Sequence, residues 1–336
     1  MKVNIYEESG YLNIAGILAL GMPFNFIVGG RATGKTYGAL KYTLDSGRKF
    51  MLMRRTQSQA DLINKPEFSP FKPVCADMGI EIDMESLSKY NSAFMRGDDL
   101  IGYTCALSTI SNMRGFDASD VDLLIYDEFI PERHERTLRN EGSAFLNAYE
   151  TINRNRELQG RKPLQALLLA NAFDIANPIF LELGLVGIAE RMQARDQEVY
   201  INRDMGVVII LPKSERISGE KRKTALYKLT EGSTYSDMAL SNSFSYNPTD
   251  RIKAQNLKEY RPIVTVGEIT IYRHKSGRKY YVSEHRTGEP PEFHTDETDL
   301  KRFISNYGRR LYKAHMAGHV LFENMLCKSL FEIYLV

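Results

Sequence analysis

The sequence predicts an α/β fold in which a mostly parallel sheet is covered by helices on both faces. In the first two-thirds of the chain, short apolar runs alternate with helical patterns, and most of these runs are continuously apolar. Strands buried on both faces need such runs, because neither side of the strand meets water. We assign residues 1–211 to this domain. Its predicted strands are 24–28, 50–53, 100–106, 121–126, 164–170 and 207–211.

Composition excludes several other classes. A length of 336 residues suits about two domains, and 43% hydrophobic with 26% charged residues excludes disordered and fibrous chains. The longest apolar stretch near the N-terminus, residues 11–22, is too short to cross a bilayer, so no membrane partner is expected. Three widely spaced cysteines predict a reducing, cytosolic setting. Residues 201–336 hold 22 Lys and Arg against 16 Asp and Glu, a mild basic excess that suits a polyanionic partner.

The pattern changes twice after residue 211. Residues 212–245 are polar and densely charged, with a helix-compatible stretch at 224–241, and we interpret them as a connector. In residues 246–336, the runs 269–272 and 279–282 flank a turn and predict a hairpin. A helical pattern follows from about residue 298. These features predict a small α+β C-terminal domain.

A phosphate-binding loop follows the first predicted strand. Residues 29–36 match the pattern G-x-x-x-x-G-K-[ST] in the required order of strand, loop and helix. Lys35 would reach the β- and γ-phosphates, and Thr36 would ligate Mg²⁺. Adenine is the expected base, because the chain lacks an Asn-Lys-x-Asp segment. The loop residues whose backbone would surround the phosphates are Gly29, Gly30, Arg31, Ala32, Thr33 and Gly34.

Two adjacent acids, Asp127 and Glu128, end a later apolar strand in the manner of a Walker B motif. Side chains alternate along a strand, so the two acids have different roles. Asp127 would hold the Mg²⁺ shell, and Glu128 would face the γ-phosphate and activate water. Strand 100–106 lies between the two motifs in the sequence. The arrangement resembles the P-loop ATPases that carry an additional strand and a catalytic glutamate.

Asn171 follows the predicted strand 164–170. Ligands of open α/β sheets bind at the carboxyl edge of the strands, where this residue would lie. It is therefore either a sensor of the γ-phosphate that also orients the attacking water, or a turn-forming residue.

These motifs together resemble the DNA-packaging ATPases of phi29-like tailed phages, most densely over residues 24–240. The resemblance implies a homomeric ring, pentameric in its best-known members, that docks on the portal of an empty prohead and pumps double-stranded DNA. It places the protein in the host cytoplasm, with a packaging RNA as a further candidate partner. The segments that carry it are the loop 29–36, the double arginine at 54–55, and residues 126–130, 154–157, 169–172, 220–224 and 231–235.

The resemblance also implies roles for arginines. Arg31 would neutralise phosphate charge from within the loop. Arg154 would be the arginine finger that a neighbouring subunit supplies, with Arg156 as its rival. A finger supplied in trans makes hydrolysis depend on ring assembly.

Three basic clusters are candidates for contacts with DNA phosphates, which a motor must grip whatever the sequence. They are Arg54 and Arg55; Lys221, Arg222 and Lys223; and Lys275, Arg278 and Lys279. In larger terminases an RNase H-like nuclease follows the ATPase. Here Tyr272, Arg273 and His274 stand where such a nuclease would place an aspartate, and two-metal cleavage needs carboxylates. We therefore expect an inactive, nuclease-like domain that docks on DNA, portal or RNA.

Two other functions fit the same motifs. A helicase or an AAA+ remodelling ATPase shares the loop and the acidic pair, although the small C-terminal domain and the segment at 154–157 favour the packaging motor. A nucleotide-dependent scaffold would bind ATP without turnover. Substitution of Glu128 distinguishes them, because only a scaffold would keep its function.

Overall fold

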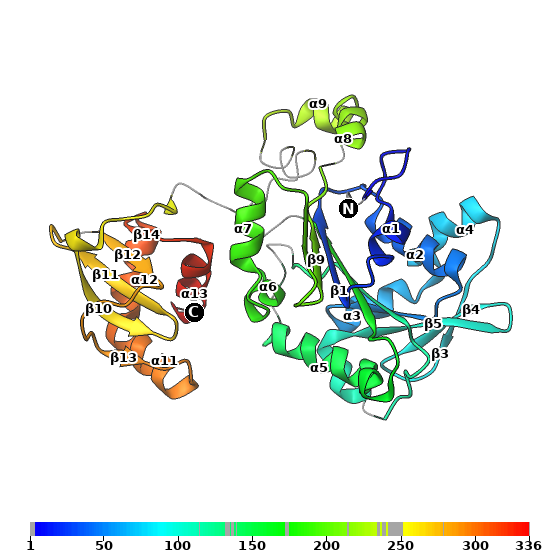
Figure 1. The fold of residues 1–336 in the computed structure, drawn as a ribbon, viewed down its shortest axis with the longest axis horizontal. Helices are drawn as coiled ribbons and strands as arrows, with labels where there is room; N and C mark the ends of the chain where they lie inside the picture. The colour runs from blue at the N-terminus through cyan, green and yellow to red at the C-terminus, as the bar shows by residue number, and fades with distance from the viewer. Residues whose placement is uncertain are drawn as a thin grey trace. The chain divides into compact units, whose positions relative to one another are not determined.

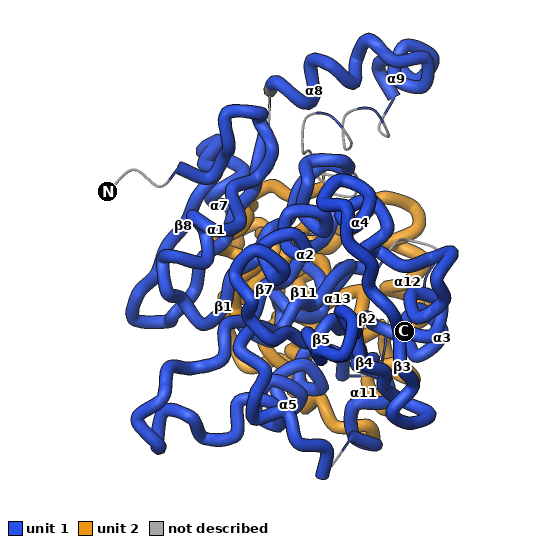
Figure 2. The backbone as a smooth tube through the Cα atoms, turned by 90° about the vertical axis from the view of Figure 1, so that its right-hand side faces the viewer, with its two compact units in different colours: residues 1–183, 191–245 blue, residues 184–190, 246–336 orange. Residues whose placement is uncertain are grey.

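The computed structural model describes residues 4–113, 115–131, 135, 138, 140–171, 175–213, 215–233, 236, 240, 251–277 and 279–335. The chain divides into two compact units, shown in different colours in Figure 2. The first comprises residues 1–183 and 191–245, and the second comprises residues 184–190 and 246–336. Each unit has a sheet and a hydrophobic core of its own.

The first unit is built on the sheet that contains the strands labelled β1, β5 and β9 in Figure 1. Its described strands follow the order β3-β4-β5-β2-β6-β7-β1-β9-β8. The six strands from β5 to β9 in this order are parallel, and β3, β4 and β8 are antiparallel additions at the two edges. The strands are β1 (Phe24–Gly29), β2 (Phe50–Arg54), β3 (Asp83–Ser86), β4 (Ser92–Arg96), β5 (Asp99–Ala106), β6 (Leu123–Asp127), β7 (Gln165–Asn171), β8 (Val199–Asn202) and β9 (Val207–Ile210).

This sheet confirms the predicted fold class, and each of the six predicted strands has a counterpart in it. The short edge strands β3, β4 and β8 were not predicted. One finding refines the expectation of an additional strand. The strand that separates β1, which leads into the phosphate loop, from β6, which carries the acids, is β7. Strand β5 lies between the two motifs only in the sequence.

Helices pack on both faces of the sheet, as continuous apolar strands require. On one face, residues such as Ile27 and Leu52 form a core with the helices α1, α2 and α4. On the other, Phe26 contacts Phe180 of α6 with ring centroids 5.3 Å apart, and Tyr126 stacks on Phe145 of α5 at 5.7 Å. The helices of the first unit up to residue 183 are α1 (Ile14–Leu18), α2 (Lys35–Ser46), α3 (Gln57–Ile63), α4 (Lys72–Met78), α5 (Glu141–Asn153) and α6 (Pro178–Glu182). Helix α7 (Val186–Ala194) is divided between the two units.

Residues of the predicted connector form two short helices, α8 (Glu215–Arg222) and α9 (Ala225–Leu229), which belong to the first unit. Between the last strand of the sheet and α8, the chain is held by a cluster of polar contacts. The backbone N–H of Lys213 donates to the hydroxyl of Tyr6 at 2.8 Å and to Glu198 at 2.9 Å. These contacts fix the start of the connector against the N-terminal segment.

The second unit has a five-stranded sheet within the described residues, in the order β13-β10-β11-β12-β14. Its centre is an antiparallel meander that contains the predicted hairpin as β11 and β12, and β13 and β14 lie parallel to β10 and β12 at the edges. The likeness of this unit to an RNase H-like nuclease stays a prediction. Its elements are β10 (Tyr260–Val266), β11 (Ile269–His274), β12 (Tyr280–Ser283), β13 (Glu292–Phe293), β14 (Val320–Phe322), α11 (Glu297–Phe303), a π-helical turn (Ile304–Gly308), α12 (Arg309–Met316) and α13 (Met325–Leu335).

In the part of the chain that the structure describes, no helix combines the length and the apolar character needed to cross a membrane.

Candidate nucleotide-binding and catalytic site

The phosphate loop connects the end of β1 to the start of α2. Its turn needs left-handed backbone at Ala32, with φ 60°, and at Gly34, with φ 82°. Gly34 also faces the ring of Tyr11, which would lie 3.0 Å from a Cβ atom at this position. A side chain at residue 34 is therefore disfavoured both by the backbone conformation and by the space available.

Lys35 is buried at the first position of α2, and its ammonium bridges the loop to a neighbouring strand. Its Nζ donates to the carbonyls of Gly29 at 3.0 Å and Gly30 at 2.7 Å. It also donates to Oδ1 of Asn171 at 3.3 Å, at the end of β7. Burial lowers the pKa of Lys35 to about 7, against the opposing influence of Asp127. The structure thus brings Lys35 and Asn171 together at the carboxyl edge of the sheet.

Thr36 and Asp127 form the part of the site that suits a magnesium ion. The hydroxyl of Thr36 donates to the two carboxylate oxygens of Asp127 at 3.0 and 3.2 Å. Both are hard oxygen ligands, which Mg²⁺ prefers, and Mg²⁺ commonly takes only one or two protein ligands beside water and phosphate. Within the described residues no group of three or more His, Cys, Asp or Glu could hold a metal. The residues present therefore fit an ion that arrives with the nucleotide.

Glu128 turns away from Asp127 because the chain changes direction directly after β6. Glu128 has a left-handed φ of 59°, a rare and costly conformation for a residue with a side chain. Asp127 is 4% exposed, whereas the side chain of Glu128 is 56% exposed. The two acids therefore have different surroundings, and the separate roles predicted for them stay predictions.

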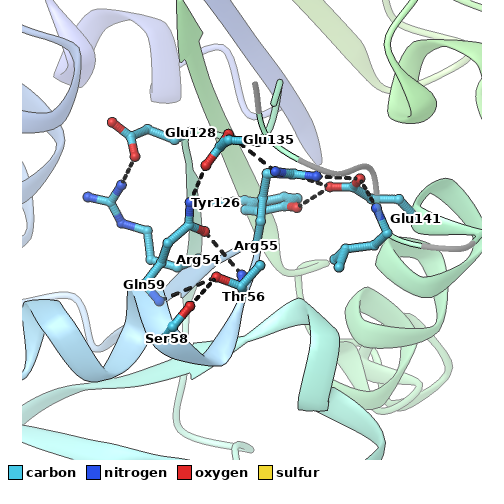
Figure 3. A network of polar contacts seen from close by, with 10 residues as sticks. Arg54, Arg55, Thr56, Ser58, Gln59, Tyr126, Glu128, Glu135 and Glu141 are labelled. Atoms are coloured by element: carbon cyan, nitrogen blue, oxygen red, sulfur yellow. Dashed lines mark hydrogen bonds and ion pairs between the residues drawn. The ribbon is translucent and has the colours of Figure 1, made fainter. Parts of the chain in front are cut away.

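Arg54, at the end of β2, links the two acids. Figure 3 shows its pair with Glu128. Its Nη2 lies 3.0 Å from Oδ2 of Asp127, and its Nη1 is paired with Oε2 of Glu128. The side chain of Arg54 is only 11% exposed. In this structure Arg54 therefore holds Glu128 by its carboxylate, beside the site that Lys35 and Thr36 define.

The two candidate finger residues have opposite surroundings. Helix α5 ends at Asn153, and Arg154 and Asn155 then adopt left-handed backbone with φ 45° and 56°. Arg154 is 40% exposed and reaches Asp117 at 3.2 Å. Arg156 is 3% exposed and donates to the carbonyl of Ser119 at 3.2 Å. Arg154 is thus partly open to solvent, and Arg156 holds the chain that leads into β6.

Comparison with known proteins identifies the family. The model of the podovirus DNA encapsidation protein (Gp16) family matches residues 6–334. The chain belongs to this family. A DNA packaging protein of Bacillus phage PZA is 26% identical, with 98% of each chain covered.

Two solved structures are similar to the chain. The N-terminal domain of the DNA packaging ATPase from bacteriophage phi29 is 25% identical with a TM-score of 0.50, covering 61% of this chain and 97% of that domain. The phi29 viral genome packaging motor assembly has a TM-score of 0.68 at 21% identity, covering 96% and 98% of the two chains, and shows the shared fold. Membership of the Gp16 family confirms the resemblance predicted from the motifs.

The structure corrects the DNA contact predicted for Arg55. Arg55 is 1% exposed, and its guanidinium binds Glu141 through Nε at 2.7 Å and Nη2 at 3.0 Å. Tyr126 donates to the same carboxylate at 3.2 Å, and Glu135 lies 3.4 Å from Nη1 (Figure 3). A buried, bidentate ion pair leaves no room for a DNA phosphate. The DNA contact predicted for Arg54 is corrected as well, because its guanidinium is already paired with Asp127 and Glu128.

The remaining predicted DNA contacts lie in different places. Lys221 lies at the phosphate loop, where it donates to the carbonyl of Arg31. Arg222 and Lys223 are exposed on the connector, and Lys223 pairs with Glu220 at 2.7 Å. On the C-terminal hairpin Lys275 and Lys279 are exposed, and Arg278 lies outside the described residues. For these exposed residues DNA binding stays a prediction.

The sequence did not predict the role of Glu141, nor that Arg54 and Arg55 bind different carboxylates. Glu141 starts α5, 86 residues after the arginine that it binds. Its burial at 1% exposure is the feature that marks it, because a carboxylate is almost never fully buried without a partner. Nothing local in the sequence reveals that partner.

Nucleotide binding is expected to take up a proton. Because burial lowers the pKa of Lys35 to about 7, most free protein at pH 8 carries a neutral Lys35. A bound polyphosphate favours the ammonium and raises this pKa, so binding at pH 8 should take up about one proton and weaken as the pH rises above 7. Calorimetric titration with ADP in buffers of different ionisation enthalpy measures the uptake. A Lys35→Arg protein, whose side chain stays charged, is the control, and no dependence on the buffer would contradict the expectation.

Proposed function

We propose that this protein is the ATP-hydrolysing subunit of a ring-shaped motor that drives double-stranded DNA into a viral prohead. The observation that carries the proposal is the assembly of Lys35, Thr36, Asp127 and Glu128 around one phosphate loop, with Arg154 exposed away from it. DNA encapsidation is the function by which the family is named. The relatives that support ATP hydrolysis include the phi29 DNA packaging ATPase.

In this account each side chain acts on the triphosphate in a defined way. Lys35 binds the β- and γ-phosphates in exchange for the carbonyls that it now contacts. Asn171, which contacts Lys35, orients water or registers the γ-phosphate. When bound at Thr36 and Asp127, Mg²⁺ would offset charge on the phosphates. Glu128 accepts the proton of the attacking water as general base.

Arg54 controls when Glu128 is available. In the structure Oε2 of Glu128 is paired with Arg54, and a carboxylate paired with a cation is a weaker base than an unpaired one. Removing a paired carboxylate from its cation costs free energy, and this pairing therefore restrains hydrolysis. A movement of β2 or of the segment after it would release Glu128.

Assembly into a ring completes the site. Arg154 is too exposed to serve as an internal anchor, and an arginine from a neighbour would stabilise the charge of phosphoryl transfer by about 10³–10⁵ in rate. The phi29 packaging motor assembly supports an oligomer. The ring that we propose is pentameric, docks on the portal of a prohead in the host cytoplasm, and accepts a packaging RNA as a further partner.

Mixing two inactive proteins tests whether Arg154 acts in trans. Glu128→Gln and Arg154→Ala proteins should each be inactive, because one lacks the base and the other lacks the finger. A random 1:1 mixture should regain up to about a quarter of the parent turnover, since that share of interfaces pairs an intact Glu128 with an intact Arg154. The measurement is DNA-stimulated ATP hydrolysis.

The control is Arg161→Ala, which removes an exposed arginine that donates to the carbonyl of Ser119 at 3.1 Å. This protein should keep the parent rate. A mixture that stays as inactive as its two components would contradict an arginine finger supplied by Arg154 of a neighbour.

A further inference from the structure

The connector helix α8 brings a second lysine to the phosphate loop. Lys221 lies in the last turn of α8, and its Nζ donates to the backbone carbonyl of Arg31, the third residue of the loop. The ring centroid of Tyr227, on α9, lies 5.5 Å from the same Nζ. Two residues 190 positions apart in the sequence are therefore in direct contact. Neither a carbonyl nor an aromatic face neutralises the charge of the lysine.

Other contacts hold α8 at this place. Arg216, the second residue of the helix, donates to the carbonyl of Glu8, and its aliphatic atoms lie 3.2 Å from the position of a Cβ atom on Gly10. Tyr11, which follows Gly10 in the chain, packs against Gly34 of the phosphate loop. The N-terminal loop is thus packed between α8 and the phosphate loop. The position of Lys221 follows from this packing rather than from its own contact alone.

Three cations gather where a triphosphate would bind. Burial lowers the pKa of Lys221, and the charge of Arg31 lowers it further. Lys221 in turn contributes to lowering the pKa of Lys35, although burial is the main cause there. Like charges held this close repel one another, and a bound polyphosphate would relieve that repulsion. The electrostatics of the cluster therefore favour an anionic ligand at Arg31, Lys35 and Lys221.

We propose that Lys221 is a nucleotide-binding residue, supplied by the connector of the same chain, that exchanges the carbonyl of Arg31 for the terminal phosphate of bound ATP. A phosphate loop cradles the β- and γ-phosphates, and the flexible four-carbon stem of a lysine allows the short movement required. The inference rests on the ATP-binding part of the proposed function. It makes the connector, which precedes the C-terminal unit in the chain, responsive to the γ-phosphate.

Binding measurements without hydrolysis test the role of Lys221. A Lys221→Met protein keeps most of the length and the apolar contact with Tyr227 but loses the charge. We expect its affinity for a non-hydrolysable ATP analogue with Mg²⁺ to fall about 10- to 100-fold, the usual effect of a lost charge-assisted hydrogen bond, and its affinity for ADP to fall by less than about threefold. Lys221→Arg should restore binding of the analogue. Lys228→Met, the same change at an exposed position of α9, is the matched control.

A spectroscopic reporter separates contact from general destabilisation. The chain contains no tryptophan, so Tyr227→Trp introduces a single fluorophore beside Lys221. The ATP analogue should change the tryptophan emission when Lys221 is present but not in the Lys221→Met background. ADP should change the tryptophan emission little in either protein. A Lys221→Gln protein replaces Lys221→Met if circular dichroism shows that the latter is not folded.

Two results would overturn the proposal. One is an unchanged affinity of the Lys221→Met protein for the analogue. The other is a loss of affinity for double-stranded DNA at fixed nucleotide with nucleotide binding intact, which would assign Lys221 to DNA. Failure of the proposed function would give a different result: the parent protein would bind the analogue but show no DNA-stimulated turnover.

Discussion

A Glu128→Gln substitution is expected to lower ATP turnover by about 10²–10⁴-fold while nucleotide affinity stays close to that of the parent protein. The amide keeps the shape of the side chain but cannot accept a proton from water. It also weakens the pair with Arg54, which should leave binding intact because Lys35 and the phosphate loop are expected to hold the phosphates. Steady-state hydrolysis and titration with a nucleotide analogue measure the two effects.

The control for this substitution is Glu150→Gln, the same chemical change at an exposed position of α5, which should keep full turnover. A Glu128→Gln protein with parent turnover would exclude Glu128 as the general base. A protein whose hydrolysis is lost while its DNA packaging persists would favour the scaffold function, in which ATP is bound but not consumed.

The second large effect concerns the buried pair of Arg55 and Glu141. An Arg55→Ala substitution should lower the free energy of unfolding by about 3–5 kcal/mol, because it leaves a carboxylate buried without its cation. The charge cannot move to solvent, since both side chains are 1% exposed or less. Denaturant unfolding of the full chain, monitored by circular dichroism, measures the loss.

A double variant isolates the cause of that loss. Arg55→Met combined with Glu141→Leu removes both charges and should recover most of the lost stability, because a buried ion pair is commonly no better than apolar residues of similar volume. A double variant as unstable as Arg55→Ala would show that packing, not the unpaired charge, dominates. A loss below about 1 kcal/mol in the single variant would contradict burial of the pair.

Local patterns were sufficient for the sheet and the loop. The predicted strands are largely apolar runs, and the phosphate loop is defined by residues adjacent in sequence, so both are visible without tertiary information. The order of the strands is not local. That β7 rather than β5 separates the two motif strands depends on how the sheet assembles, and nothing in either strand specifies its neighbour.

The roles of the arginines also depend on tertiary structure that local sequence patterns do not show. Arg54 and Arg55 look alike in the sequence, yet at the end of β2 their side chains point to opposite sides, one to Asp127 and Glu128 and the other to Glu141. Arg154 and Arg156 differ because two left-handed residues end α5, a turn that no glycine or proline signals. Lys221 belongs to a basic run that the sequence marks only as a candidate DNA contact, and the packing of the connector brings it to the phosphate loop.

ATP turnover per subunit, measured as the protein concentration is raised with and without long double-stranded DNA, tests the central claim most directly. If each site is completed by Arg154 of a neighbour, the specific activity should climb with concentration, rise further with DNA, and collapse in the Arg154→Ala protein. A specific activity that is flat, indifferent to DNA and unchanged by that substitution would contradict a ring motor and identify a self-contained ATPase.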